Sequence, residues 1–166
     1  LYGLTLRSGN DAAVAIAEYI SGDVDSFAAL MNQEAAAMGA TRSHFVNPNG
    51  LPDENHYTCV YDMYLIFSNA IKNDTFVSII GTTSYDVTYT DASGEAVTHT
   101  WENTNQYLTG NATTPDGFQI VGGKTGTTGE AGYCLVLYSY NPSGQPIISI
   151  VFKADGKSNL YLLMNE

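Results

Sequence analysis

A glycine-rich segment between two apolar runs constrains the fold of this chain more than any other feature. Residues 122–129 hold four glycines, three threonines and one lysine. The runs on either side, 118–121 and 133–138, are rich in β-branched and aromatic residues, which is typical of half-buried strands. We therefore predict strands over 118–124 and 132–140. The glycine backbone between them can be approached closely, because glycine has no Cβ.

The side chains of this segment suit an anion. Lys124 is one of only six basic residues in the chain, and Thr125, Thr127 and Thr128 add hydroxyl groups. A cation, hydroxyls and accessible backbone N–H groups together bind a carboxylate or stabilise a developing oxyanion. A glycine-rich hairpin with a solvated lysine has the same pattern. A second motif must therefore decide between the two interpretations.

The charge balance of the chain excludes several classes of partner. The 166 residues, enough for one domain, include 17 Asp and Glu against 6 Lys and Arg, a formal net charge of −11. Nucleic acids and anionic membranes are bound through basic surfaces, which this composition does not provide. No apolar run approaches the roughly 20 residues of a membrane-spanning helix. We therefore expect neither a nucleic acid nor an anionic membrane surface as a partner.

Helical patterns occupy the first half of the chain and strand patterns the second. The predicted helices cover 1–6, 12–20, 24–38, 58–73 (capped by Thr58), 74–80 and 160–164. The predicted strands cover 84–90, 96–101, 118–124, 132–140 and 147–154. This order predicts an α+β fold with a mainly helical part, 1–80, and a part made of a hairpin and an antiparallel sheet, 81–166. The chain opens in an apolar pattern without Met, so we expect a fragment of a longer protein.

Histidine and cysteine spacing predicts no metal or cofactor. None of the three histidines, His44, His56 and His99, has the spacing of metal ligands. Cys59 and Cys134 lie in apolar runs, where free cysteine behaves as a small buried hydrophobe. The pattern leaves open whether these two residues are free or joined in a disulfide.

The second motif is Ser8-Gly9-Asn10, which lies at a helix-to-helix turn. A single Ser-x-Asn triplet is most often a helix cap. Here it precedes a Lys-Thr-Gly on a strand by 116 residues, counted from Ser8 to Lys124. Both triplets, in this order and with a Ser-x-x-Lys box upstream, form the motif set of class A β-lactamases and penicillin-binding proteins.

Three longer segments make the resemblance specific. They are residues 4–13 around the serine triplet, residues 44–51 (His-Phe-Val-Asn-Pro-Asn-Gly-Leu) and residues 123–134 around the lysine triplet. With 103–105 (Asn-Thr-Asn), they closely resemble the serine-type D-Ala-D-Ala carboxypeptidases, the low-molecular-mass penicillin-binding proteins. The similarity covers essentially the whole chain and implies a partial fold of the β-lactamase/DD-peptidase type.

The resemblance implies a role for each site residue. In this family a serine attacks the bond between two terminal D-alanines of a peptidoglycan stem peptide and forms an acyl-enzyme. Ser8 would pass a proton to the leaving amine, and Asn10 would orient the catalytic lysine of the Ser-x-x-Lys box and the substrate amide. Lys124 and Thr125 would hold the terminal carboxylate. Gly126 would leave the strand open to substrate, and the backbone N–H of Thr127 would form half of the oxyanion hole.

The chain departs from the family in one respect: none of its serines is followed three residues later by a lysine. We therefore expect the nucleophile upstream of Leu1 and no activity from this chain alone. Two other interpretations remain, a β-lactamase of the same fold and a non-catalytic peptidoglycan-binding domain. The resemblance also implies β-lactams as covalent inhibitors of the full enzyme and an extracytoplasmic location, secreted or anchored to the outer face of the cytoplasmic membrane. In the fold of this family, a strand from the N-terminal part pairs with the strand 147–154. We therefore expect that such a segment completes the sheet, or that two copies of this chain pair through 147–152.

Overall fold

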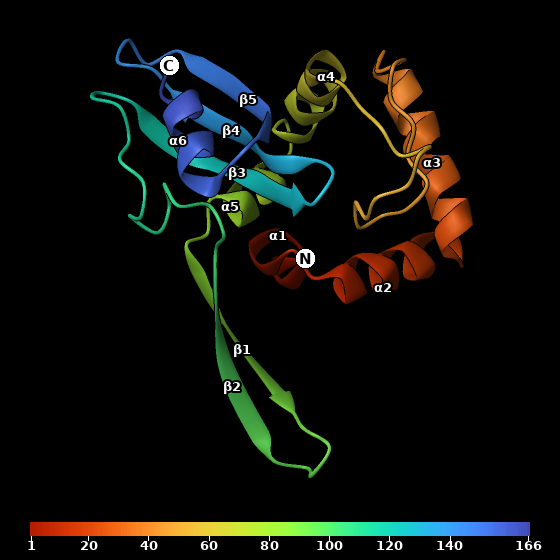
Figure 1. Ribbon diagram of the computed structural model, residues 1–166. Helices are drawn as coiled ribbons and strands as arrows, with labels where there is room; N and C mark the ends of the chain where they lie inside the picture. Colours follow the sequence, from red (N-terminus) through yellow and green to blue (C-terminus); the bar gives the residue numbers. More distant parts are fainter.

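The computed structural model describes residues 1–166, and its helices and strands alternate little along the chain (Figure 1). The first half is helical: α1 (Tyr2–Arg7), α2 (Asn10–Ser21), α3 (Val24–Ala37), α4 (Val60–Ala70) and α5 (Asp74–Ile80). The second half holds β1 (Ser84–Thr90), β2 (Ala96–Glu102), β3 (Gln119–Thr128), β4 (Gly132–Tyr140) and β5 (Pro146–Ala154), followed by α6 (Lys157–Met164). This is the α+β order that the sequence predicts.

Small buried residues let α2 pack closely against α3, and a side-chain cap stabilises the start of α3. Ala13 and Ala17, one turn apart on α2, are both buried, and α2 packs against α3. The side chain of Asp23 accepts a hydrogen bond from the backbone N–H of Ser26 at 2.7 Å and caps α3. That bond holds the pKa of the Asp23 carboxyl below its usual value. A carboxylate at the start of a helix is also stabilised by the helix dipole.

The core lies on both faces of an antiparallel sheet in the order β3-β4-β5. On one face Leu135 and Leu137 pack with Leu160 and Tyr161 of α6. On the other face Val136, together with half-buried side chains of β5, packs against α4 and α5. Alternation along β4 thus sends neighbouring residues into two separate clusters, because side chains alternate across a strand.

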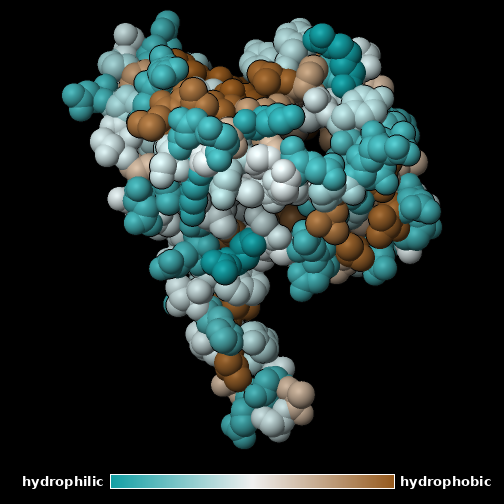
Figure 2. Space-filling model, viewed as in Figure 1, coloured by the Kyte–Doolittle hydropathy of each residue, from teal (hydrophilic) through white to brown (hydrophobic).

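Both outer strands of this sheet have a free edge. β3 pairs only with β4 along its length, and β5 pairs only with β4. Residues 147–152 of β5 are half-buried despite their apolar sequence. Apolar surface gathers over the region of β5 and the adjoining end of α4 (Figure 2).

A second sheet, the β1-β2 hairpin, projects from the body of the molecule (Figure 1). Its base is held by aromatic packing on α1: the rings of Tyr2 and Tyr85 stack with centroids 4.0 Å apart. A Cβ on Gly3 would lie 3.3 Å from the Trp101 ring. The hairpin therefore buttresses the helix that ends at Ser8.

Four details differ from the sequence-based prediction. β3 continues to Thr128 instead of ending at Lys124, because Thr125 to Thr128 keep their pairing with β4. Helix α6 begins at Lys157, and α4 begins at Val60 and ends at Ala70. Thr58 does not cap α4, since its hydroxyl pairs with that of Ser43.

Cys59 and Cys134 are both free, and no helix combines the length and apolar character needed to cross a membrane.

Candidate active site

Ser8 lies where α1 ends and α2 begins. Its backbone is in the left-handed region, with φ 55° and ψ 41°. The turn is closed by a hydrogen bond from the Gly9 N–H to the Gly3 carbonyl oxygen at 3.0 Å. Leu6, two residues earlier, is fully buried and anchors the helix. This sharp turn between two anchored helices gives the Ser8 hydroxyl a defined position.

The glycines before Lys124 serve the packing of β3. A Cβ on Gly123 would collide with the carbonyl oxygen of Val136 on β4. A Cβ on Gly122 would lie 2.7 Å from the backbone of Ile80, at the end of α5. The close approach inferred from the sequence is therefore made by the protein's own backbone at these two positions. Only Gly126, where the nearest atom to a Cβ lies 4.0 Å away, leaves the strand open.

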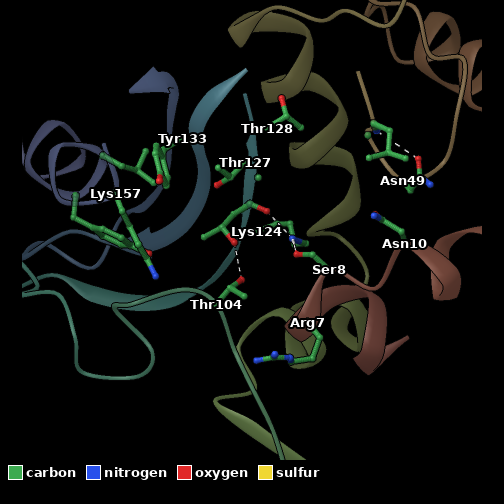
Figure 3. A pocket seen from close by; sticks show the side chains of 16 residues that line it. Arg7, Ser8, Asn10, Asn49, Thr104, Lys124, Thr127, Thr128, Tyr133 and Lys157 are labelled. Carbon is green, nitrogen blue, oxygen red and sulfur yellow. Dashed lines mark hydrogen bonds between the residues drawn. The ribbon is translucent and has the colours of Figure 1, made fainter. Parts of the chain in front are cut away.

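Lys124 joins the two sequence motifs. Its Nζ donates hydrogen bonds to the Oγ of Ser8 and to the carbonyl oxygen of Thr125, the latter at 2.6 Å (Figure 3). Burial of the ammonium group lowers the pKa of Lys124 to about 8. The lysine is therefore held as a desolvated cation, which acts more strongly on a nearby anion than a solvated one does.

The predicted site residues line one cleft of about 460 Å³. Its walls come from the α1–α2 turn, β3, the segment 49–51 and the start of α6 (Figure 3). The six predicted residues on its lining are Ser8, Asn10, Lys124, Thr125, Gly126 and Thr127. The structure thus brings all six to one place, whereas their individual roles remain predictions.

The cleft is cationic although the chain is acidic. Arg7, Lys124 and Lys157 line it, which are three of the six basic residues of the whole chain. None of the 17 acidic residues does so. Low-dielectric walls with charges of one sign concentrate the field within a cleft. The cleft therefore favours a small anionic group over a neutral one.

Sequence reasoning missed several residues of the lining. Lys157 lies in no motif, and Arg7 and Thr104 lie within segments of the resemblance but were given no role. The Thr104 hydroxyl forms a 2.6 Å hydrogen bond with the hydroxyl of Thr125. A cation count along the chain could have drawn attention to Arg7 and Lys157. Only the fold could show that Thr104 meets Thr125.

The loop that supplies residues 49–51 is tied down by a buried carboxylate. Asp62, in the first turn of α4, is 1% exposed. It accepts hydrogen bonds from the Arg42 N–H at 2.7 Å and from the Ser43 hydroxyl at 2.8 Å. Burial opposes ionisation of Asp62, but these hydrogen bonds together outweigh it and lower its pKa. Because the Ser43 hydroxyl also pairs with Thr58, both ends of the loop are joined.

A second, largely apolar cavity of about 490 Å³ adjoins the cleft. It shares Ser8 and Lys124, among other residues, with the cleft, and its other walls come from helices α1, α3, α4 and α5, the loop around residues 45–50 and the sheet. Met31, Phe67 and Val136 are among the side chains that face it. The side of the cleft that holds Ser8 and Lys124 is thus continuous with an apolar space between the two halves of the chain.

An α+β fold whose Ser-x-Asn turn faces a Lys-Thr-Gly strand across a cationic cleft defines a protein of the DD-peptidase class. The sequence profile of the D-alanyl-D-alanine carboxypeptidase family matches residues 1–156. The chain therefore belongs to the D-alanyl-D-alanine carboxypeptidase family.

Individual relatives agree with this assignment. The chain is 37% identical over 155 residues to the D-alanyl-D-alanine carboxypeptidase DacF of Bacillus subtilis (strain 168), over 93% of this chain and 37% of that protein. It is 35% identical over 158 residues to the D-alanyl-D-alanine carboxypeptidase of Streptomyces sp. (strain K15), over 91% of this chain and 52% of that protein. The chain thus spans between about a third and a half of the length of these curated relatives.

Solved structures support the fold. A mutant of the Streptomyces K15 DD-transpeptidase superimposes with a TM-score of 0.88 at 31% identity, covering 99% of this chain and 64% of that chain. The D-alanyl-D-alanine carboxypeptidase of Mycobacterium tuberculosis H37Rv superimposes with a TM-score of 0.78 at 28% identity, covering 95% of this chain and 56% of that chain.

Proposed function

We propose that the complete protein carrying this chain is a serine-type D-Ala-D-Ala carboxypeptidase that removes the terminal D-alanine from peptidoglycan stem peptides. The observation that carries the proposal is the hydrogen bond from Lys124 to Ser8. It joins two motifs 116 residues apart at the mouth of a cationic cleft. Such a cleft suits a peptide that ends in a carboxylate.

The proposed reaction passes through an acyl-enzyme. A serine oxygen attacks the carbonyl carbon of the penultimate D-alanine and gives its proton to the lysine of the Ser-x-x-Lys box; the C–N bond then breaks, and D-alanine leaves as the amine. Ser8 donates a proton to that amine and is reprotonated from the lysine of the Ser-x-x-Lys box, because a hydroxyl donates and accepts at once. Water then hydrolyses the ester. Asn10 orients the substrate amide, and Lys124 raises the positive potential at the site.

Recognition of the substrate is assigned to β3. Thr125 and Lys124 hold the terminal carboxylate, and Gly126 leaves room for the peptide backbone. Thr127 is exposed, and its backbone N–H is in this proposal one donor of the oxyanion hole, where a single donor is worth roughly 3 kcal/mol of transition-state stabilisation. Arg7 and Lys157 add to the positive field, as their place on the lining of the cleft supports.

The nucleophile comes, in this proposal, from a segment outside residues 1–166, since no Ser-x-x-Lys occurs within them. The apolar cavity beside Ser8 and Lys124 supports this, because an apolar helix could fill it and present a serine to the cleft. The free edge of β5 likewise supports pairing with a further strand. We place the protein outside the cytoplasm, where peptidoglycan lies, and expect β-lactams to acylate the same serine.

The test uses the complete protein and an N-acylated tripeptide that ends in D-Ala-D-Ala. Release of D-alanine is expected from the wild type and from Lys72→Ala, which changes an exposed lysine away from the cleft. Lys124→Ala should lower the rate at least a hundredfold. Rapid hydrolysis of penicillin without release of D-alanine would instead indicate a β-lactamase, and neither reaction would indicate a binding domain.

The present chain provides a further check by intact-mass spectrometry. Residues 1–166 should gain no mass from penicillin, because the nucleophile is absent. A stoichiometric adduct on a serine of this chain would contradict the assignment of the nucleophile.

A further inference from the structure

Thr104 ties together the two halves of the cleft. Its backbone N–H donates to the carbonyl oxygen of Leu6 at 3.2 Å, on the helix that ends at Ser8. Its hydroxyl meets the Thr125 hydroxyl on β3 at 2.6 Å (Figure 3). Both threonines line the cleft. Thr104 is thus in contact with both α1, which precedes the Ser-x-Asn turn, and β3, which carries the Lys-Thr-Gly triplet.

Two buried asparagines hold Thr104 in this position. Asn103, 6% exposed, donates to the carbonyl oxygen of Thr82 at 2.9 Å and accepts from the N–H of Asn105 at 2.9 Å. Asn105, fully buried, accepts from the N–H of Tyr107 at 3.1 Å. Buried side-chain amides are costly unless they are hydrogen-bonded, and the Nδ2 of Asn105 has no partner. These two asparagines fix the backbone on both sides of Thr104, which is itself half-exposed. This arrangement indicates that the position of Thr104 matters for function.

The hydroxyl pair has one proton to spare. Each threonine hydroxyl carries one hydrogen and two acceptor lone pairs. In the 2.6 Å contact one hydroxyl donates to the other, and neither side chain bonds to any other group of the cleft. If Thr104 donates, the Thr125 hydrogen is directed away from Thr104 and remains available to a ligand. Two of the three N–H donors of Lys124 bind Ser8 and the Thr125 carbonyl oxygen, so the third is available to the same ligand beside the Thr125 hydroxyl.

We propose that Thr104 is a positioning residue. Its hydroxyl donates to Thr125 and so turns the Thr125 hydrogen toward the terminal carboxylate of the substrate, which makes the site specific for a free carboxylate. This inference rests on the proposed function and names the residue that sets its specificity. The charge of the cleft attracts the anion, whereas the threonine pair recognises it by a directed hydrogen bond.

The test compares the complete protein with three variants. Thr104→Val keeps the shape of the side chain and removes the hydroxyl, and Thr104→Ser keeps the hydroxyl. Thr98→Val is the matched control, because Thr98 and Thr88 form a similar exposed hydroxyl pair on the hairpin, at 2.8 Å. Thr104→Ala replaces the valine variant if circular dichroism shows that the latter is unfolded.

The measurement is binding followed by NMR, with two tripeptides that both end in D-Ala-D-Ala. One has a free terminal carboxylate and the other a terminal amide. Thr104→Val should bind the acid about tenfold more weakly, as expected for one hydrogen bond to a charged group. Its affinity for the amide should change less than twofold, and Thr104→Ser and Thr98→Val should match the wild type for both peptides.

Two outcomes would overturn the inference. In the first, Thr104→Val weakens acid and amide equally, which indicates that Thr104 only supports the fold. In the second, the wild type does not prefer the acid. Release of D-alanine by the wild type is measured separately, so a protein that binds the acid through Thr104 but releases no D-alanine would refute the proposed reaction and retain the proposed role of Thr104.

Discussion

Replacing Lys124 by methionine should abolish the proposed release of D-alanine, while the free energy of unfolding at neutral pH should hardly change. Burial lowers the pKa of Lys124 from 10.5 to about 8. At neutral pH the amine is protonated in the folded and unfolded chains, so holding the desolvated cation costs folding about 3 kcal/mol. Methionine removes this cost and also the two hydrogen bonds that the Lys124 cation donates, each worth roughly 1.5 kcal/mol. The two effects nearly cancel, so the free energy of unfolding at neutral pH should change by less than about 1 kcal/mol.

The pH dependence makes this prediction sharper. Between pH 8 and 10.5 the unfolded chain binds a proton at this lysine that the folded chain has lost, so the stability of the wild type rises with pH. The cost of burying the charged amine acts in full below pH 8 and is absent above pH 10.5, where the amine is neutral in both states. Lys124→Met has no such group. The wild type should therefore gain about 2.5 kcal/mol relative to the variant from pH 7 to pH 10.

The assay is unfolding by urea at pH 7, 8, 9 and 10, followed by far-ultraviolet circular dichroism. Tyrosine ionisation at the highest pH affects both proteins and cancels in the difference. Lys72→Met is the control, and its difference from the wild type should not vary with pH. A difference between wild type and Lys124→Met that stays constant within about 0.5 kcal/mol over this range would refute the argument that Lys124 is a desolvated cation.

Three further predictions follow from the packing. Asp62→Ala removes the buried acceptor of the Arg42 N–H and the Ser43 hydroxyl and should lower the free energy of unfolding by roughly 1–3 kcal/mol, measured by urea unfolding; a loss below about 0.5 kcal/mol would show that the loop is held by other contacts. Gly123→Ala should disrupt the pairing of β3 with β4 and abolish slow amide exchange along β4, because its Cβ would collide with Val136, whereas Gly126→Ala should preserve it. Residues 1–166 alone should associate through the free edge of β5, so light scattering should give a mass above 17.8 kDa; a monomer with protected amides along β5 would contradict this.

Local patterns were sufficient to predict most of the elements. The hairpin over 84–90 and 96–101 was predicted from alternating residues and a turn, and it is confirmed with one additional residue, Glu102. Helices α2, α3 and α5 lie within a few residues of the predicted ranges. These elements depend on residues close in sequence, which is why periodicity and capping residues reveal them.

The sequence-based prediction is wrong where contacts between residues far apart in the sequence determine the structure. The threonines after Lys124 have the composition of a loop, yet β3 continues through them because β4 supplies partners as far as the pair Thr128 and Gly132. Thr58 has the chemistry of a helix cap, but Ser43, 15 residues earlier, takes its hydroxyl. The motifs indicated Ser8 and Lys124 as candidate site residues. No spacing rule could indicate Thr104 or Asp62, because their partners are set by the tertiary fold.

The left-handed backbone of Ser8 has a consequence for how such a protein can be improved. Glycine adopts this conformation freely, whereas a residue with a Cβ pays roughly 1 kcal/mol for it. A selection for thermal resistance alone would therefore favour glycine at position 8, and with it the loss of the hydroxyl that meets Lys124. On the proposed role of Ser8, the most heat-resistant variants of such a library would have lost activity, so thermal stability and catalysis would place opposite demands on position 8.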